Sequence, residues 1–167
     1  MDMTQGVLFV HSAPRALCPH IEWAAGGAIG AQARFDWTPQ PAAPGLVRAE
    51  VCWRAPAGSG ARIASALRGW DSLRYEVTEE PSPGVDGGRW SHTPDLGIYH
   101  AVTDSAGNIL VPEDRIRSVM ERSAGDPAQF SSEMATALGE AWDEELDPFR
   151  HAGEGAQIGR ASCRERV

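Results

Sequence analysis

The chain has 167 residues, a formal net charge of −8, and 42% hydrophobic and 23% charged residues. This length suits one domain with a hydrophobic core, and the composition is typical of a soluble globular protein. No apolar run is long enough to span a bilayer and no secretion signal is recognised, so we expect a cytoplasmic protein without membrane insertion. All 15 basic residues are Arg. Because phosphate binding needs clustered positive charge, the negative net charge indicates that nucleic acid is not a partner.

The first 80 residues alternate between strand and helix patterns. The apolar run 7–10 predicts a buried strand, and apolar residues at helical spacing over 21–29 predict an amphipathic helix that ends at Gly30. A second helical pattern covers 63–70. The proline-rich segment 38–45 predicts a loop. Three further segments alternate as strands do: 33–37, 47–54 and 73–78. The order β-α-β-β-α-β is that of the ferredoxin-like fold, in which two helices cover one face of a four-stranded antiparallel sheet.

The second half of the chain begins with a flexible acidic segment at 79–88. Two strands follow at 89–93 and 97–103, and a helix begins at Pro112. A last helix has apolar residues four apart, and Asp147 and Pro148 end it: Phe130, Met134, Leu138, Trp142 and Leu146. We therefore predict a single α+β domain over 1–157. It has a ferredoxin-like core at 5–80 and an extension at 89–157 made of a β-hairpin and two helices.

Six segments resemble one family, in order along the chain: GVLFVHSAPRALCPHIEWA, DWTPQPAAPG, ARIASALRGW, LRYEVTEEP, TPDLGIYHA and LDPFRHAGEGA. They are similar to an actinobacterial family of uncharacterised proteins, domain-of-unknown-function family 3145, over residues 4–157. The resemblance implies no activity. Because genes of this family often lie near fatty-acid synthesis genes, it implies a link to fatty-acid metabolism. Residues 158–167, IGRASCRERV, depart from the family and resemble a translated sequencing adapter, so we assign them no function.

Four side chains with chemical potential lie near the end of the first strand: His11, Cys18, His20 and Glu22. Zn²⁺ accepts imidazole and thiolate, so His11, Cys18 and His20 are candidate metal ligands. All four are also candidate catalytic residues. A helix N-terminus lowers the pKa of a thiol, so Cys18 could act as a nucleophile paired with a histidine. The spacing H-x6-C-x-H is not that of a standard zinc finger or ribbon. A capping and packing role, with Cys18 as a small buried hydrophobe, is the favoured interpretation.

The loop containing Gly58, Ser59, Gly60 and Arg62 follows a predicted strand and precedes a helix. Two glycines let the backbone approach a ligand, and free amides with an Arg attract an anion such as a nucleotide or a coenzyme A group. The third glycine of a dinucleotide fingerprint and a Walker-type Lys are missing, so a plain flexible loop is the favoured interpretation.

Two further groups are weaker candidates. Arg150 and His151, in a polar segment near the end of the chain, have the chemistry to bind a ligand, although a docked loop explains them equally well. A set on the late hairpin has the chemistry for acid–base catalysis but no nucleophile motif: His92, Asp95, Tyr99 and His100. Of the six tryptophans, Trp90 is predicted to be the most exposed and to mark a partner surface.

No motif in the sequence specifies a reaction or a cofactor. We therefore expect a non-enzymatic binding or regulatory module, with another protein or a second copy of the chain as its partner. The first alternative is a metal-dependent or Cys/His enzyme that uses His11, Cys18 and His20. The second is a protein that binds a small anionic ligand at Gly58–Arg62.

Overall fold

A computed structural model describes residues 2–30 and 33–152. Within these ranges the chain forms seven strands, a short 3₁₀ helix at Arg15–Leu17 and five α-helices. The strands are β1 Met3–Pro14, β2 Thr38–Pro39, β3 Leu46–Pro56, β4 Arg74–Glu79, β5 Gly87–Thr93, β6 Gly97–Thr103 and β7 Ile109–Leu110. The helices are α1 Cys18–Ile29, α2 Ser59–Leu67, α3 Glu113–Arg122, α4 Pro127–Ala137 and α5 Glu140–Arg150. The predicted α+β class is confirmed.

One antiparallel sheet runs through the described part of the chain, with the strands in the order β2-β3-β1-β4-β5-β6-β7. The predicted core and extension therefore share a sheet, because β4 of the first part pairs with β5 of the second. None of the described helices is both long and apolar enough to cross a bilayer. The segment 158–167, which we assigned to a non-native tail, lies outside the described residues.

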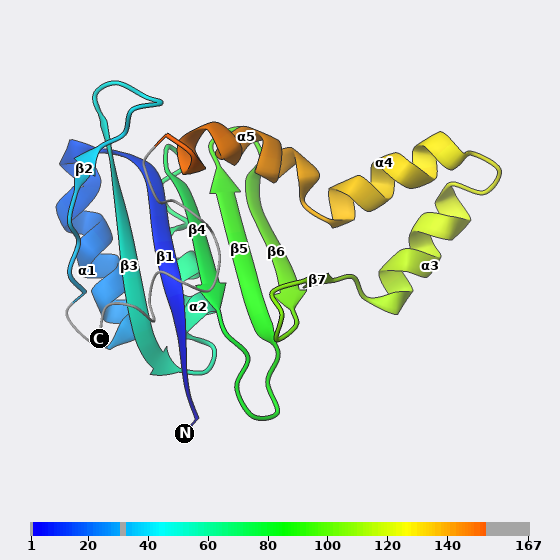
Figure 1. The fold of residues 1–167 in the computed structure, drawn as a ribbon, viewed down its shortest axis with the longest axis horizontal. Helices are drawn as coiled ribbons and strands as arrows, with labels where there is room; N and C mark the ends of the chain where they lie inside the picture. The colour runs from blue at the N-terminus through cyan, green and yellow to red at the C-terminus, as the bar shows by residue number, and fades with distance from the viewer. Residues whose placement is uncertain (1, 31–32, 153–167) are drawn as a thin grey trace.

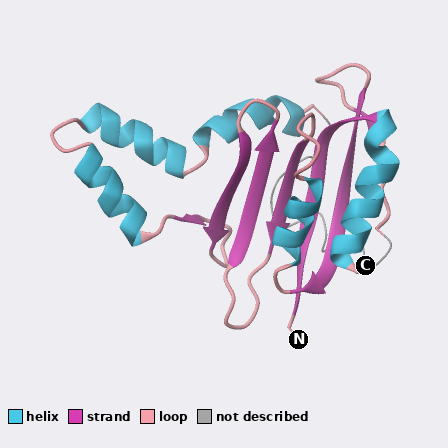
Figure 2. Cartoon of the chain, turned by 180° about the vertical axis from the view of Figure 1, so that it is seen from behind, coloured by secondary structure: helices cyan, strands magenta, loops and turns pink. Residues whose placement is uncertain are grey.

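The sheet has a different cover on each face. Helices α1 and α2 lie on one face, as Figure 2 shows from behind, and α5 lies across the opposite face in Figure 1. The first face, which we call the core face, holds the main hydrophobic cluster, with buried residues such as Leu8, Val10, Tyr75 and Val77 packed against the two helices. The other face, which we call the α5 face, holds polar side chains such as Glu76 and Ser91, which alternate along the strands with the residues of the core face.

Strand β1 contains an irregularity that changes which residues face the core. Its register with both neighbouring strands shifts just after Val10. Leu8 and Val10 belong to the hydrophobic cluster before the shift, and Ala13 belongs to it afterwards. A β-bulge of this kind adds one residue and reverses the alternation of faces. The bulge surrounds His11, which is 3% exposed.

The segment 33–37 is not a strand, so that prediction is wrong. Its aromatic residues make tertiary contacts instead of ladder hydrogen bonds. The Trp37 indole donates to Glu22 Oε1 at 2.8 Å, and the rings of Phe35 and Trp37 stack 5.3 Å apart. Pairing begins where we predicted a loop, at Thr38–Pro39, which is an edge of the sheet. Pro39 is tolerated there because its missing N–H would point away from the ladder.

The last predicted helix is two helices, so the extension contains three helices rather than two. The chain breaks between α4 and α5 at Gly139, whose φ is 76°. A Cβ at that position would lie 2.7 Å from the Tyr99 ring, so close packing also requires glycine. Helix α5 then continues past Pro148 to Arg150. Tertiary contacts of Arg150 hold this last turn in place despite the proline.

Helices α3 and α4 project from the sheet as a hairpin (Figures 1 and 2), which with Leu138 we call the helical arm, residues 113–138. The two helices contact each other, and Arg122 Nε pairs with Glu133 Oε1 at 3.0 Å across them. Only three of the arm's residues are buried: Val119, Ser123 and Ala137. The arm is therefore the least packed part of the described structure.

Candidate functional site

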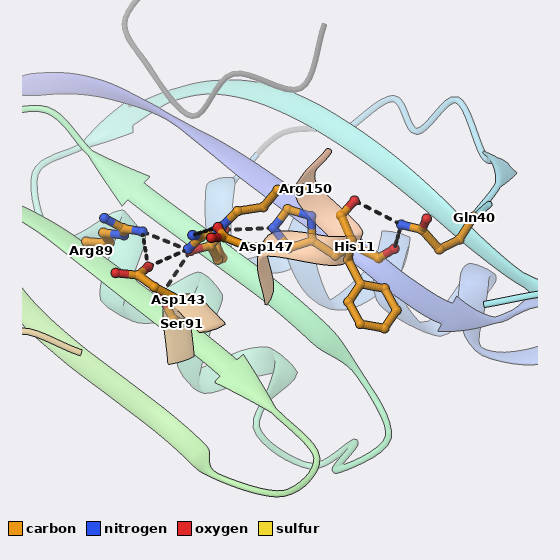
Figure 3. A network of polar contacts seen from close by, with 9 residues as sticks. His11, Gln40, Arg89, Ser91, Asp143, Asp147 and Arg150 are labelled. Carbon is orange, nitrogen blue, oxygen red and sulfur yellow. Dashed lines mark hydrogen bonds and ion pairs between the residues drawn. The ribbon is translucent and has the colours of Figure 1, made fainter. Parts of the chain in front are cut away.

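The strongest concentration of buried charge surrounds Glu76 on β4, on the α5 face. Glu76 is fully buried. The side chains around it come from three elements: His11 from β1, Arg89 and Ser91 from β5, and Arg150 from α5 (Figure 3). His11 Nε2 lies 2.7 Å from Glu76 Oε2, and Ser91 Oγ donates to Oε1 at 3.2 Å. We call this group with its acidic partners on α5 the Glu76 network.

Arg150 connects the buried and exposed parts of the Glu76 network. Its Nε donates to Glu76 Oε2 at 2.9 Å, and its Nη2 donates to Oε1, which makes a bidentate pair. The same guanidinium donates to Asp143 and Asp147, each at 2.9 Å. Arg89 Nη2 lies between Glu76 at 3.2 Å and Asp143 at 3.1 Å. Two arginines are therefore shared by three carboxylates, and the arrangement fixes α5 on the sheet.

The protonation states of the Glu76 network follow from this geometry. Burial raises the pKa of Glu76, but the hydrogen bonds from His11 and Arg150 and the charge of Arg150 outweigh burial and hold that pKa well below its usual range. Burial lowers the pKa of Arg150, but Glu76 and Asp143 raise it above its ordinary value. Both groups are therefore charged. Because a carboxylate only accepts hydrogen bonds, Nε2 of His11 carries the hydrogen that Glu76 accepts.

The backbone around His11 is also fixed. Gln40, which is 1% exposed, donates from Nε2 to the His11 carbonyl at 2.6 Å and to the Phe149 carbonyl at 3.3 Å. The guanidinium of Arg74 lies 4.4 Å from the centre of the Phe149 ring and also donates to Ser12 Oγ at 3.3 Å. The β1 bulge, the residue after β2 and the end of α5 are therefore held together, as Figure 3 shows for His11 and Gln40.

The sequence model of one protein family matches residues 7–160, and its description is "Protein of unknown function (DUF3145)". The chain belongs to this family. The membership confirms the resemblance of the six segments. No curated protein and no solved structure matches the chain. Both the Glu76 network and the helical arm lie inside the matched residues.

In this DUF3145 member the candidate metal ligands do not come together. His11 is bonded to Glu76 on the α5 face. Cys18 begins α1, which covers the core face, and its thiol donates to the Pro14 carbonyl at 3.8 Å. His20 is exposed on α1. Within the described residues, no group of three or more His, Cys, Asp and Glu side chains is placed to hold a metal ion. The prediction of a shared His11–Cys18–His20 site is therefore wrong.

The environment of Cys18 does not favour the alternative in which its thiol is activated. Burial raises the pKa of the Cys18 thiol, and the negative charge of Glu22 raises it further. The Glu22 carboxylate accepts the indole hydrogen of Trp37, a structural contact. Cys18 is half-buried. The favoured packing interpretation of this stretch fits Cys18 and Glu22 better than the catalytic one.

The loop at the start of α2 holds an anion, but the chain itself supplies it. Gly58 N donates to Glu79 Oε1 at 2.7 Å, and Gly60 N donates to Oε2 at 2.6 Å. A Cβ on Gly60 would lie 2.7 Å from that carboxylate, which explains the glycine. Arg62 Nη2 donates to Ser59 Oγ at 2.6 Å. The amides that we assigned to an external anion are therefore occupied by Glu79, which caps the helix.

Arg150 and His151 have separate environments. Arg150 is 6% exposed and bonded to Glu76, Asp143 and Asp147, so its ligand is the protein's own carboxylates. His151 is exposed, and its backbone N–H donates to the Asp147 carbonyl at the end of α5. Arg150 was a candidate for binding a ligand, and the carboxylates that it contacts in the structure belong to the chain itself.

The histidines and tyrosine of the late hairpin lie on both faces of the sheet. His92 faces the core, stacked 5.0 Å from Tyr75. Tyr99 lies on the α5 face, where its hydroxyl donates to the Ala137 carbonyl at 2.8 Å. His100 and Asp95 are exposed. His92 and Tyr99 make structural contacts, since His92 Nδ1 lies 2.7 Å from the Leu73 carbonyl and Tyr99 bonds Ala137.

Trp90 is not the most exposed tryptophan. Its ring is half-buried against Gly60 and Gly88 and stacks 4.7 Å from the His100 ring. Trp23 on α1 is instead 81% exposed. The buried residues of α1 are Ile21, Ala24 and Ala25, so the helix packs through these smaller side chains and Trp23 points outward.

Sequence reasoning missed the centre of the Glu76 network. A weak signal exists on each side of the contact. Glu76 is the central polar residue of the alternating strand 73–78, and Asp143, Asp147 and Arg150 recur on α5 at i, i+4 and i+7, which is one helix face. Neither pattern identifies the residues that it contacts, because those residues lie on a distant segment of the chain.

Proposed function

We propose that this DUF3145 member is a non-enzymatic binding module and that the helical arm is its contact element. The observation that carries the proposal is the apolar surface of the projecting arm. The exposed fractions of Met120, Phe130 and Leu138 are 57%, 37% and 44%. Exposed apolar groups of this kind, gathered on one element, favour a protein interaction site.

The lengths of the two arm helices support the same proposal. Helix α3 has 10 residues and α4 has 11. Isolated helices shorter than about 12–15 residues are marginally stable in water, and helices in proteins are stabilised mainly by burying an apolar face. Phe130, Met134 and Leu138 recur at i, i+4 and i+8, yet none is buried. A partner that covers this stripe would supply the missing packing.

The rest of the molecule would serve as the rigid base of the arm. We infer a ferredoxin-like unit from the strand order β4-β1-β3-β2, which fits that topology, and from the position of α1 and α2 on one face. The Glu76 network holds α5, and α4 meets α5 at Gly139. A fixed α5 therefore sets the direction of the arm. The cytoplasmic location, which the sequence favours, and the link to fatty-acid metabolism, which the family resemblance implies, stay predictions.

Affinity capture with the full chain tests the proposal. The arm variant replaces three side chains with serine, M120S, F130S and L138S, and the control variant W23S removes the most exposed tryptophan, which lies on α1. We expect the unmodified chain and W23S to capture the same proteins from a lysate of the source organism, and the arm variant to lose them while its thermal unfolding stays cooperative.

Two outcomes would count against the proposal: capture of the same proteins by the arm variant, or a loss of capture caused by W23S alone. Analytical sedimentation of the purified chain tests whether the partner is a second copy of the chain. A dimer that becomes a monomer in the arm variant would support binding through the arm and would make a second copy the partner.

A further inference from the structure

We infer that the partner of the helical arm is a basic amphipathic helix of another protein. This inference rests on the proposed function of the arm and adds the chemistry of the partner. It comes from the charges of α3 and α5, the two helices that contact α4 and its exposed apolar stripe. Four glutamates of α3 and α5 make no ion pair with any described residue: Glu121, Glu140, Glu144 and Glu145.

The arginines of the same helices are mostly used inside the molecule. Arg117 pairs with Glu113 on α3 at 2.6 Å, and Arg122 pairs with Glu133 on α4. Arg150 belongs to the Glu76 network. Among the described residues of these helices, Arg115 alone among the arginines has no ion pair. The two helices that contact α4, α3 and α5, therefore carry an excess of unpaired negative charge, and a complementary surface carries positive charge.

The shape of the apolar stripe fits a helix. Phe130, Met134 and Leu138 follow one face of α4 over eight residues, which is about 12 Å at 1.5 Å per residue. Two turns of a helix with apolar residues at i, i+3 or i+4 and i+7 cover that length by ridge-into-groove packing. Glu140 follows Leu138 by two residues and Glu121 follows Met120 directly, so unpaired carboxylates lie next to exposed apolar residues in the chain.

A second copy of this chain fits the surface less well. The chain has a net charge of −8. In a two-fold dimer through the arm, the same acidic patch would lie close to its own copy, and like charges at an interface oppose association. The unpaired glutamates of α3 and α5 also disfavour nucleic acids and anionic membrane surfaces as occupants.

The test uses a synthetic 18-residue helix of Leu and Lys, arranged so that Leu forms one face, and the same peptide with Glu in place of Lys. Fluorescence anisotropy with the full chain measures binding of each labelled peptide at low and high salt. We expect the Leu/Lys peptide to bind, the Leu/Glu peptide to bind at least about tenfold more weakly, and added salt to weaken the Leu/Lys complex.

Matched variants locate the charge effect. The variant E140Q, E144Q and E145Q removes three charges beside the arm, and the control D36N, E80Q and D86N removes three exposed charges on other loops. We expect about a tenfold weaker Leu/Lys complex for the first variant and no change for the control. The arm variant M120S, F130S and L138S should lose binding of the peptide.

Several outcomes overturn the inference: equal binding of both peptides, an equal loss in the control, or a dimer that depends on the arm. If lysate capture depends on the arm but the Leu/Lys peptide does not bind, the proposed function stands and this inference is wrong. If neither the capture nor the peptide depends on the arm, both are wrong.

Discussion

Arg150 and Glu76 lie 74 residues apart in the sequence, and they form a buried bidentate pair in the structure. The pair joins the last turn of α5 to the middle of β4. Because His11 and Arg89 bond the same carboxylate, one side chain connects three strands and a helix. The position of the helical arm, which continues from α5 through Gly139, depends on this contact.

Replacing Glu76 with Gln should destabilise the protein. The E76Q variant leaves two arginines near a neutral amide in a buried site, and removal of one member of a buried ion pair costs about 3 kcal/mol or more. Urea unfolding measures the loss of free energy. The control E80Q, which neutralises an exposed neighbour, should change stability by less than about 0.5 kcal/mol. Equal unfolding midpoints for the two variants would contradict the role of Glu76.

The pH dependence of stability should reflect the same carboxylate. The pKa of Glu76 is lower in the folded protein than its usual value, so its ionisation contributes full stability above the usual range. That contribution is lost as the pH falls from about 4.5 toward the folded-state pKa. Urea midpoints between pH 7 and pH 3 should fall less steeply for E76Q than for the unmodified chain. Parallel curves would be inconsistent with a charged Glu76.

The break between α4 and α5 predicts an unequal cost for two glycine substitutions. Gly125 and Gly139 both have positive φ, but a Cβ at Gly125 would meet open space and a Cβ at Gly139 would meet the Tyr99 ring. We expect about 1 kcal/mol of destabilisation for G125A from backbone conformation. We expect at least about 1 kcal/mol more for G139A from overpacking. Thermal unfolding measures the destabilisation caused by each variant. Equal destabilisation by G125A and G139A would show that the Tyr99 ring moves aside without cost.

Cys18 should react slowly with alkylating reagents. Burial and Glu22 raise the pKa of the thiol, so little thiolate is present at neutral pH. Iodoacetamide labelling over a pH series, with peptide mapping to follow Cys18 itself, measures the reaction. We expect the rate to keep rising through pH 9. A plateau below pH 8 would instead support the activated thiol of the catalytic hypothesis.

Local pattern predicted much of this fold. Alternation correctly identified the strands β3 and β4, and it placed the hairpin strands β5 and β6 within two residues of their observed starts. It failed at 33–37, where contacts of Phe35 and Trp37 replaced the ladder. It also failed at Gly139, because a helical period that continues across a glycine does not reveal the left-handed turn.

The candidate site was less predictable, because its residues are brought together by topology. His11 and Cys18 are close in sequence, but the β1 bulge and the following turn place them on opposite sides of the sheet. Glu76 and Arg150 are distant in sequence and bonded in space. Sequence proximity therefore favoured the wrong cluster, and the correct one required knowledge of where α5 crosses the strands.

The central claim is that the helical arm has little packing within the chain and needs a binding partner to cover it. Hydrogen–deuterium exchange of the free full-length chain tests this claim most directly. Amides of α3 and α4 should exchange at least about 100-fold faster than amides of β1 and β4, because local opening of the arm exposes little buried surface. Adding the captured partner should slow exchange in the arm and leave the strands unchanged. Arm amides as protected as those of β1 in the free chain would contradict the account.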